Sequence, residues 1–233
     1  MTFRHCIVPF ILMLAGALFA QERPSPEVMK KLQEAYELQQ EQRYADALAK
    51  LDEVEAAAPN SPELHNMRGA LYLTPALRDF DKAQALLDKA LALQPNSIAP
   101  RFNHCELLFV KHEWAPAKAA FQKVLDDFPK LQLPIRHLTL YKRLICEVKL
   151  DQIAAAEKTL KDHFTFMDDT PAYYYGQAAI AFGKKDEKAA REWLVRAEGI
   201  YKKDAMSAYV DALMEARWIT NITLPPADAP KSE

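Results

Sequence analysis

Apolar residues recur along most of the chain at intervals of three and four positions, which places them on one face of an α-helix. Within this periodicity, one order of residue types is repeated: an aromatic, an alanine three positions on, a large apolar residue, a small apolar residue and a closing proline. The alanines of this series are Ala47, Ala83, Ala117, Ala156 and Ala190, at steps of 36, 34, 39 and 34 residues. The pattern predicts helical hairpins that repeat about every 34 residues.

Each position in the repeated order has a packing role. A small residue permits close approach where the second helix of a hairpin crosses the first, and a proline ends the hairpin because it cannot continue a helix. Ser25, Ser61 and Thr170 each precede a proline and are expected to cap a first helix. We expect first helices over 26–41, 62–74, 98–112, 134–149 and 171–183. We expect second helices over 44–58, 79–94, 114–128, 151–164 and 186–202.

This order of residues resembles the tetratricopeptide repeat over residues 26–202, most closely in the first three copies, since the last two lack the closing proline. The resemblance implies an all-α, right-handed solenoid of about five hairpins. The repeats would be 26–59, 62–95, 98–129, 134–164 and 171–202. An amphipathic segment over 204–219, with Met206, Val210, Leu213 and Trp218 on one face, is expected to cap the array. The polar, proline-rich end over 220–233 is expected to be disordered.

Residues 1–20 are typical of a secretory signal peptide: Arg4 precedes an apolar run that ends in small residues near Ala20. The apolar run is shorter than a membrane span requires, and an uncleaved anchor is the alternative. Because no cysteine follows the run, we do not expect a lipoprotein. The sequence therefore predicts an exported protein, periplasmic or extracellular, with no membrane span in the mature chain.

Composition and charge narrow the class of function. Only 5 glycines are present, which suits an all-α protein. Without residues 1–20 the chain keeps 29 basic and 32 acidic side chains, a formal charge of −3, which does not favour nucleic acid. Cys105 and Cys146 are expected to be buried free thiols. The His104-Cys105-Glu106 run lacks an oxyanion site, and the histidines show no metal spacing, so we expect no enzyme, no cofactor and no metal.

The register of the first helices follows from burial, since an unpaired charge between helices is costly. Leu32, Ala35, Phe102, Cys105 and Leu144 are therefore placed inward instead of their charged neighbours; in the second repeat Gly69 and Tyr72 already fit. Tyr141 and Tyr175 are assigned to the core as well, and Tyr174 to the flank toward the neighbouring hairpin. Gly176 is expected to expose backbone beside Tyr173.

The residues left for the concave groove are Asn66, Asn103, His104, Lys142, Arg143 and Tyr173. Some tetratricopeptide repeats clamp acidic peptide ends with Lys and Asn, but Leu32 and Tyr36 stand at those positions here. The basic helix over 134–149 suggests a partner segment with negative charge. A solvated helix face is the alternative explanation.

The resemblance implies a protein-interaction module, since helical repeat arrays bind extended or helical segments of other proteins. We therefore expect a scaffold or adaptor of the cell envelope that holds a partner protein or peptide on its concave face. The alternative is a structural homo-oligomer that assembles through the C-terminal helix.

Overall fold

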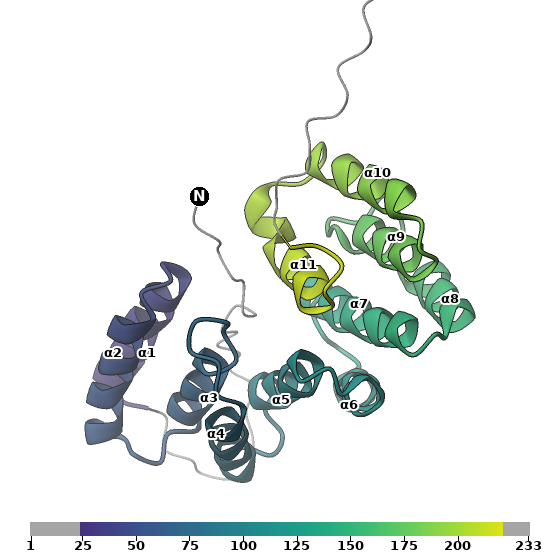
Figure 1. Ribbon diagram of the computed structural model, residues 1–233. Coiled ribbons are helices and arrows are strands. Elements are labelled where there is room, and N and C mark those ends of the chain that lie inside the picture. The colour runs from purple at the N-terminus through teal and green to yellow at the C-terminus, as the bar shows by residue number, and fades with distance from the viewer. Residues whose placement is uncertain (1–23, 221–233) are drawn as a thin grey trace, which may run out of the picture. The chain divides into compact units, whose positions relative to one another are not determined.

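The computed structural model describes residues 24–220, which contain eleven α-helices and no strand (Figure 1). The all-α class is thereby confirmed. The expected signal peptide over 1–20 and nearly all of the expected disordered tail, residues 221–233, lie outside the described residues. The described chain divides into two compact units between Leu107 and Leu108, near the end of α5.

Unit 1 contains four complete helices and most of a fifth: α1 (Pro26–Gln40), α2 (Tyr44–Ala57), α3 (Pro62–Leu71), α4 (Phe80–Leu93) and α5 (Ile98–Val110). Unit 2 contains α6 (Trp114–Asp127), α7 (Leu133–Lys149), α8 (Ile153–His163), α9 (Ala172–Gly183), α10 (Glu187–Glu198) and α11 (Lys203–Glu215). In unit 1, α1 packs against α2 and α3 against α4. In unit 2, α6 packs against α7, α7 against α8 and α9, and α9 against α10.

Two of the three expected helix caps are confirmed. The hydroxyl of Ser25 accepts from Val28 N at 3.3 Å, and that of Ser61 from Leu64 N at 3.2 Å. Thr170 is not a cap. Its hydroxyl pairs with Nδ1 of His137 at 2.7 Å, so a buried contact between α7 and the start of α9 takes the place of capping.

Four first helices end in the same turn, in which a residue that is not glycine adopts a left-handed backbone. These residues are Gln42, His112, Asp151 and Lys185, with φ between 60° and 63°. In each case the next amide donates back to a carbonyl of the last helical turn, for example Asp186 N to Ala181 O at 2.9 Å. This arrangement satisfies the last carbonyls of the helix and starts the second helix.

The connection from α3 to α4 differs from the other hairpin turns. α3 ends at Leu71, three residues earlier than expected, because Thr74 donates its hydroxyl to Leu71 O at 2.7 Å. Asp79 N then donates to Tyr72 O at 3.0 Å, and the Asp79 carboxylate caps α4 by accepting from Lys82 N.

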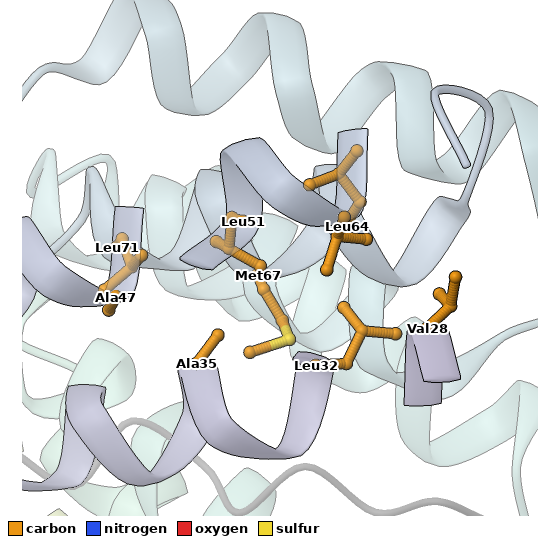
Figure 2. Packing of buried hydrophobic residues seen from close by; sticks show 9 residues of the cluster. Val28, Leu32, Ala35, Ala47, Leu51, Leu64, Met67 and Leu71 are labelled. Carbon is orange, nitrogen blue, oxygen red and sulfur yellow. The ribbon is translucent and has the colours of Figure 1, made fainter. Parts of the chain in front are cut away.

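The core of unit 1 contains the residues that the repeat places inward. Leu32, Ala35, Ala47 and Leu51 are fully buried, and Figure 2 shows side chains of α1, α2 and α3 pointing toward one another. Phe102 and Cys105 of unit 1 and Leu144 of unit 2 are buried as well, so the register chosen for them is confirmed, whereas Tyr72 is only half-buried. The two cysteines in the described residues are free and buried.

Glycines mark close helix approaches in both units. A Cβ added at Gly69 would lie 2.8 Å from Leu87 Cγ, where α4 crosses α3 beside Ala83. A Cβ added at Gly176 would lie 2.5 Å from Leu160 Cδ1 of α8. The expectation that Gly176 exposes backbone beside Tyr173 is therefore wrong, because Gly176 is buried where α8 approaches α9.

α11 packs against α7 and α9, which are both first helices (Figure 1). It ends at Glu215, four residues before the expected end, because Arg217 adopts φ 58° and Trp218 N donates back to Leu213 O at 3.1 Å. Its apolar residues Met206, Val210 and Leu213 are buried. Among residues 24–220, no helix is long and apolar enough to cross a membrane.

Candidate functional site

Two of the six groove candidates meet in unit 1. Asn103 of α5 donates its Nδ2 to Oδ1 of Asn66 on α3 at 2.8 Å, and both side chains are buried. We call these residues the Asn pair. Within the described residues, Nδ2 of Asn66 and Oδ1 of Asn103 make no hydrogen bond. The pair therefore keeps one amide donor group and one carbonyl acceptor for another molecule.

His104 is the residue after Asn103, but its side chain lies on a different side of α5 from the Asn pair, because successive helix residues point about 100° apart. Its Nδ1 is 3.9 Å from Oδ1 of Asp88 on α4. Arg68 of α3 makes a similar contact with the preceding helix, where its guanidinium binds Asp52 and Glu55 of α2. His104 thus contacts the second helix of the preceding hairpin, as Arg68 does.

Arg143 lies in a polar network within unit 2. Its guanidinium donates to Gln122 Oε1 on α6 and to Thr159 Oγ1 on α8, the latter at 2.7 Å. Thr159 in turn donates to Glu147 at 2.8 Å, and Arg143 Nε lies 3.5 Å from the same carboxylate. The network joins α6, α7 and α8, so Arg143 holds three helices together.

Lys142 is buried, with only 6% of its surface exposed. Its Nζ lies 5.0 Å from the ring centroid of Phe109, in the last turn of α5. An ammonium over an aromatic face is stabilised by the ring electrons, more strongly when water is excluded.

Tyr173 belongs to an aromatic cluster formed by Phe166, Tyr173, Tyr174, Trp193 and Tyr201. Its ring centroid is 5.9 Å from that of Trp193 on α10 and 6.5 Å from that of Phe166. Tyr174 is buried against Trp193 of its own hairpin and against Tyr201, instead of covering a flank toward the neighbouring hairpin. The structure thus places Tyr173 and Tyr174 in one cluster on the α10 side of α9.

A second group of tyrosines lies on the opposite side of α9, and we call it the Tyr triad: Tyr141 of α7, Tyr175 of α9 and Tyr209 of α11. The ring centroids are 6.3 Å apart for Tyr141 and Tyr175, 5.5 Å for Tyr175 and Tyr209, and 5.0 Å for Tyr141 and Tyr209. Tyr141 Oη also donates to Tyr209 O at 3.1 Å. Both predicted core tyrosines are buried, and the segment that covers them is α11.

The end of α11 is held by a second set of contacts. Trp218 stacks on Phe182 of α9, with ring centroids 5.7 Å apart. Lys149 of α7 places Nζ 4.3 Å from the Trp218 centroid and 5.8 Å from that of Trp114. The carbonyl of Glu215 accepts from Nε2 of His112 at 2.8 Å.

The surroundings of the Tyr triad and of Lys149 favour the neutral forms of these side chains. Burial raises the pKa of the Tyr141 hydroxyl well above its ordinary value, and burial raises the pKa of Tyr175 and Tyr209 too. Burial lowers the pKa of Lys149, with a smaller contribution from the nearby Arg217. The tyrosines therefore act as neutral packing and hydrogen-bonding groups at neutral pH.

Sequence reasoning did not recognise the face beneath α11, although one signal was available. Tyr175 lies 34 residues after Tyr141, and Tyr209 lies 34 residues after Tyr175. The 34-residue period of the tyrosines therefore continues into α11, although α11 packs against α7 and α9 together. Within residues 24–220, no group of three or more His, Cys, Asp or Glu side chains is arranged to hold a metal ion.

Three solved structures have a similar fold. A tetratricopeptide repeat protein of Parabacteroides merdae ATCC 43184 superposes with a TM-score of 0.61 at 18% identity, covering 82% of this chain and 71% of that one. PilW, described as a widely conserved type IV pilus biogenesis factor, superposes with a TM-score of 0.62 at 23% identity, and the match covers 82% of this chain and 88% of PilW. A thermophilic TPR protein of Thermus thermophilus superposes with a TM-score of 0.61 at 18% identity, and the match covers 80% of this chain and 99% of that one.

No protein-family model matches the sequence, and no curated protein matches it at a significant level. The likeness is therefore one of three-dimensional structure. It agrees with the paired helices and with the residues that the repeat predicted to be buried. The chain has the tetratricopeptide-repeat fold.

Proposed function

We propose that the chain is a non-enzymatic interaction scaffold that holds a segment of a partner protein on the first helices of unit 1. The observation that carries the proposal is the Asn pair. Its two amides lie on neighbouring first helices and keep a donor and an acceptor that no described residue uses. An extended or helical peptide offers matching C=O and N–H groups along its backbone.

The recognition proposed here depends on amides and not on charge. Lys142 and Arg143 suggested an acidic partner, but the structure places both against groups of unit 2. His104 lies beside the carboxylate of Asp88 within unit 1. A partner recognised through its backbone hydrogen bonds fits the Asn pair without requiring acidic side chains.

The proposal also places the scaffold in the cell envelope. Residues 1–20 have the pattern of an export signal, and one structure with a similar fold is described as a type IV pilus biogenesis factor. Both observations favour a role in assembling another envelope component. The non-enzymatic part of the proposal is supported by the fold, whose known examples serve mainly in binding.

The proposal is tested by capture of partners from the envelope fraction of the source organism. Full-length tagged protein is compared with the Asn66→Ala and Asn103→Ala double variant, and with Lys89→Ala on the exposed surface of α4 as the matched control. We expect the double variant to lose at least about tenfold of the captured partner, because two amide contacts are removed. Equal capture by all three proteins, with unchanged melting temperatures, would contradict the proposal.

The alternative function, a homo-oligomer built through the C-terminal helix, requires α11 to leave its position. Met206, Val210 and Leu213, which would form the contact, are already buried within the chain. We therefore expect light scattering of the full chain to give the mass of a monomer at micromolar concentration. A stable dimer that is lost when residues 204–233 are deleted would favour the alternative.

A further inference from the structure

α11 does not continue the array as a next repeat would. Packed helices lie about 8–10 Å apart, so alternate first helices of a regular array lie roughly twice that distance from one another. α11 nevertheless packs against α7 as well as against α9, and the ring centroids of Tyr141 and Tyr209 are 5.0 Å apart. α11 therefore lies across α7 and α9 together, as a bound helix would, instead of beside α9 alone.

α11 turns its apolar side inward, as a helix bound to a surface does. Met206, Tyr209 and Leu213 lie on one side of the helix and are buried, and the ring of Tyr209 contacts Tyr141 of α7 and Tyr175 of α9. A helix of 13 residues is too short to be stable alone in water, so its helical state depends on this face. Within residues 24–220, it also lacks the second helix that completes each of the other hairpins.

The fit of α11 is incomplete at the Tyr209 hydroxyl. Tyr209 Oη is buried without a hydrogen bond of good geometry, and the nearby Thr170 hydroxyl is already paired with His137. A poorly satisfied buried hydroxyl lowers the affinity of α11 for the face, which favours exchange.

We propose that the α7–α9 face is a second binding surface that accepts an amphipathic helix of a partner protein, and that this helix displaces α11. The occupant is defined by the chemistry of α11. It carries an aromatic ring that enters the space between Tyr141 and Tyr175, and a main-chain carbonyl that accepts from Tyr141 Oη. A second aromatic ring, nine residues further on, covers Phe182 and Lys149.

Displacement has a defined cost, because α11 is tethered to the surface that it covers. A tethered segment competes at an effective concentration on the order of millimolar. The affinity of an external helix is reduced by the fraction of time for which α11 is bound. Weakening α11 without changing α7 or α9 therefore raises the apparent affinity for an external helix.

The experiment uses the full chain and a fluorescent synthetic peptide of residues 202–220 as the probe. Tyr209→Ala removes the central ring of α11 and leaves the face intact, and it is expected to bind the probe at least about tenfold more tightly than the wild type. Ala205→Ser, on the exposed side of α11, is the matched control and is expected to bind as the wild type does. Adding Tyr175→Ala to Tyr209→Ala is expected to remove the gain.

Probe binding is also measured for a second variant of α11 and for the double variant of the Asn pair. Trp218→Ala loosens only the end of α11 and is expected to give a smaller gain, about threefold, if Tyr209→Ala fails to fold by circular dichroism. The Asn66→Ala and Asn103→Ala double variant is expected to bind the probe unchanged, which separates this surface from the one proposed in unit 1. Equal probe binding by the wild type, Tyr209→Ala and Trp218→Ala would overturn the proposal. A wild-type dimer that exchanges α11 between copies would also overturn it, because the occupant would then be a second copy.

Discussion

The first helices of the two units carry different chemistry on the same hairpin framework. In unit 1, α3 and α5 are joined by the Asn pair, which keeps polar groups available. In unit 2, α7 and α9 present Tyr141 and Tyr175, and α11 covers them. The hairpin packing therefore leaves the residues on this side of the first helices free to vary between the units. A polar face retains hydrogen-bonding groups for a ligand, whereas an aromatic face requires apolar cover.

The largest expected effect separates the two faces by stability. Tyr141→Ala removes a fully buried ring and its hydrogen bond to α11, and is expected to cost about 3–5 kcal/mol of unfolding free energy. Asn66→Ala in unit 1 is expected to cost about 1 kcal/mol, because one hydrogen bond is lost. Urea unfolding followed by circular dichroism measures both variants. Similar costs for the two would show that the faces do not differ as described.

The second prediction tests what the units share. Ala83→Leu in unit 1 and Ala190→Leu in unit 2 each place a larger side chain at a fully buried hairpin position. Each is expected to cost about 1–3 kcal/mol, because an overpacked crossing forces the helices apart. Thermal melting measures the loss. An unchanged melting temperature for Ala83→Leu would count against the hairpin packing in unit 1.

The third prediction concerns acid sensitivity. Burial lowers the pKa of His65 in unit 1, and of His137 and His163 in unit 2, below the ordinary 6.5. The unfolded chain therefore binds more protons than the folded chain as the pH falls below about 6.5. Stability is full above that pH and decreases below it, and we expect the larger decrease in unit 2, which holds two of the three histidines.

The two units can be observed separately, because Trp114, Trp193 and Trp218 all lie in unit 2. Tryptophan fluorescence during urea unfolding should give a midpoint that falls between about pH 7.5 and about pH 5.5. His137→Asn should flatten this dependence, and His65→Asn should leave it unchanged. A fluorescence midpoint that is constant over this range would refute the prediction.

The smallest expected effect comes from the hairpin turns, where the two units are alike. Gln42 in unit 1 and Lys185 in unit 2 adopt a left-handed backbone that costs less for glycine. Gln42→Gly and Lys185→Gly are each expected to raise stability by up to about 1 kcal/mol, measured by thermal melting. Gly199→Ala serves as a contrasting control, since its backbone is right-handed and an added Cβ has no contact closer than 3.5 Å.

Most of the fold could be predicted from local patterns. The repeated alanines, the serine caps at Ser25 and Ser61 and the inward positions such as Leu32 and Phe102 all behave as their periodicity indicates. The candidate site could be predicted only in part. Asn66 and Asn103 are brought together, whereas Arg143 joins helices within unit 2 and Tyr173 joins a cluster with Trp193. A helical register shows which side of a helix a residue is on, but it does not show what lies opposite.

The all-α class and the repeated hairpins follow from the residues alone, because helix periodicity and close packing at alanine are local properties of the chain. The burial of Tyr141 and Tyr175 follows from the same periodicity. The helix that covers them, α11, could be identified only in the folded protein. That helix is amphipathic and has no second helix within the described residues, so its position depends on which distant apolar surface accepts it. Tyr209 reaches the rings of α7 and α9 only after the chain has folded.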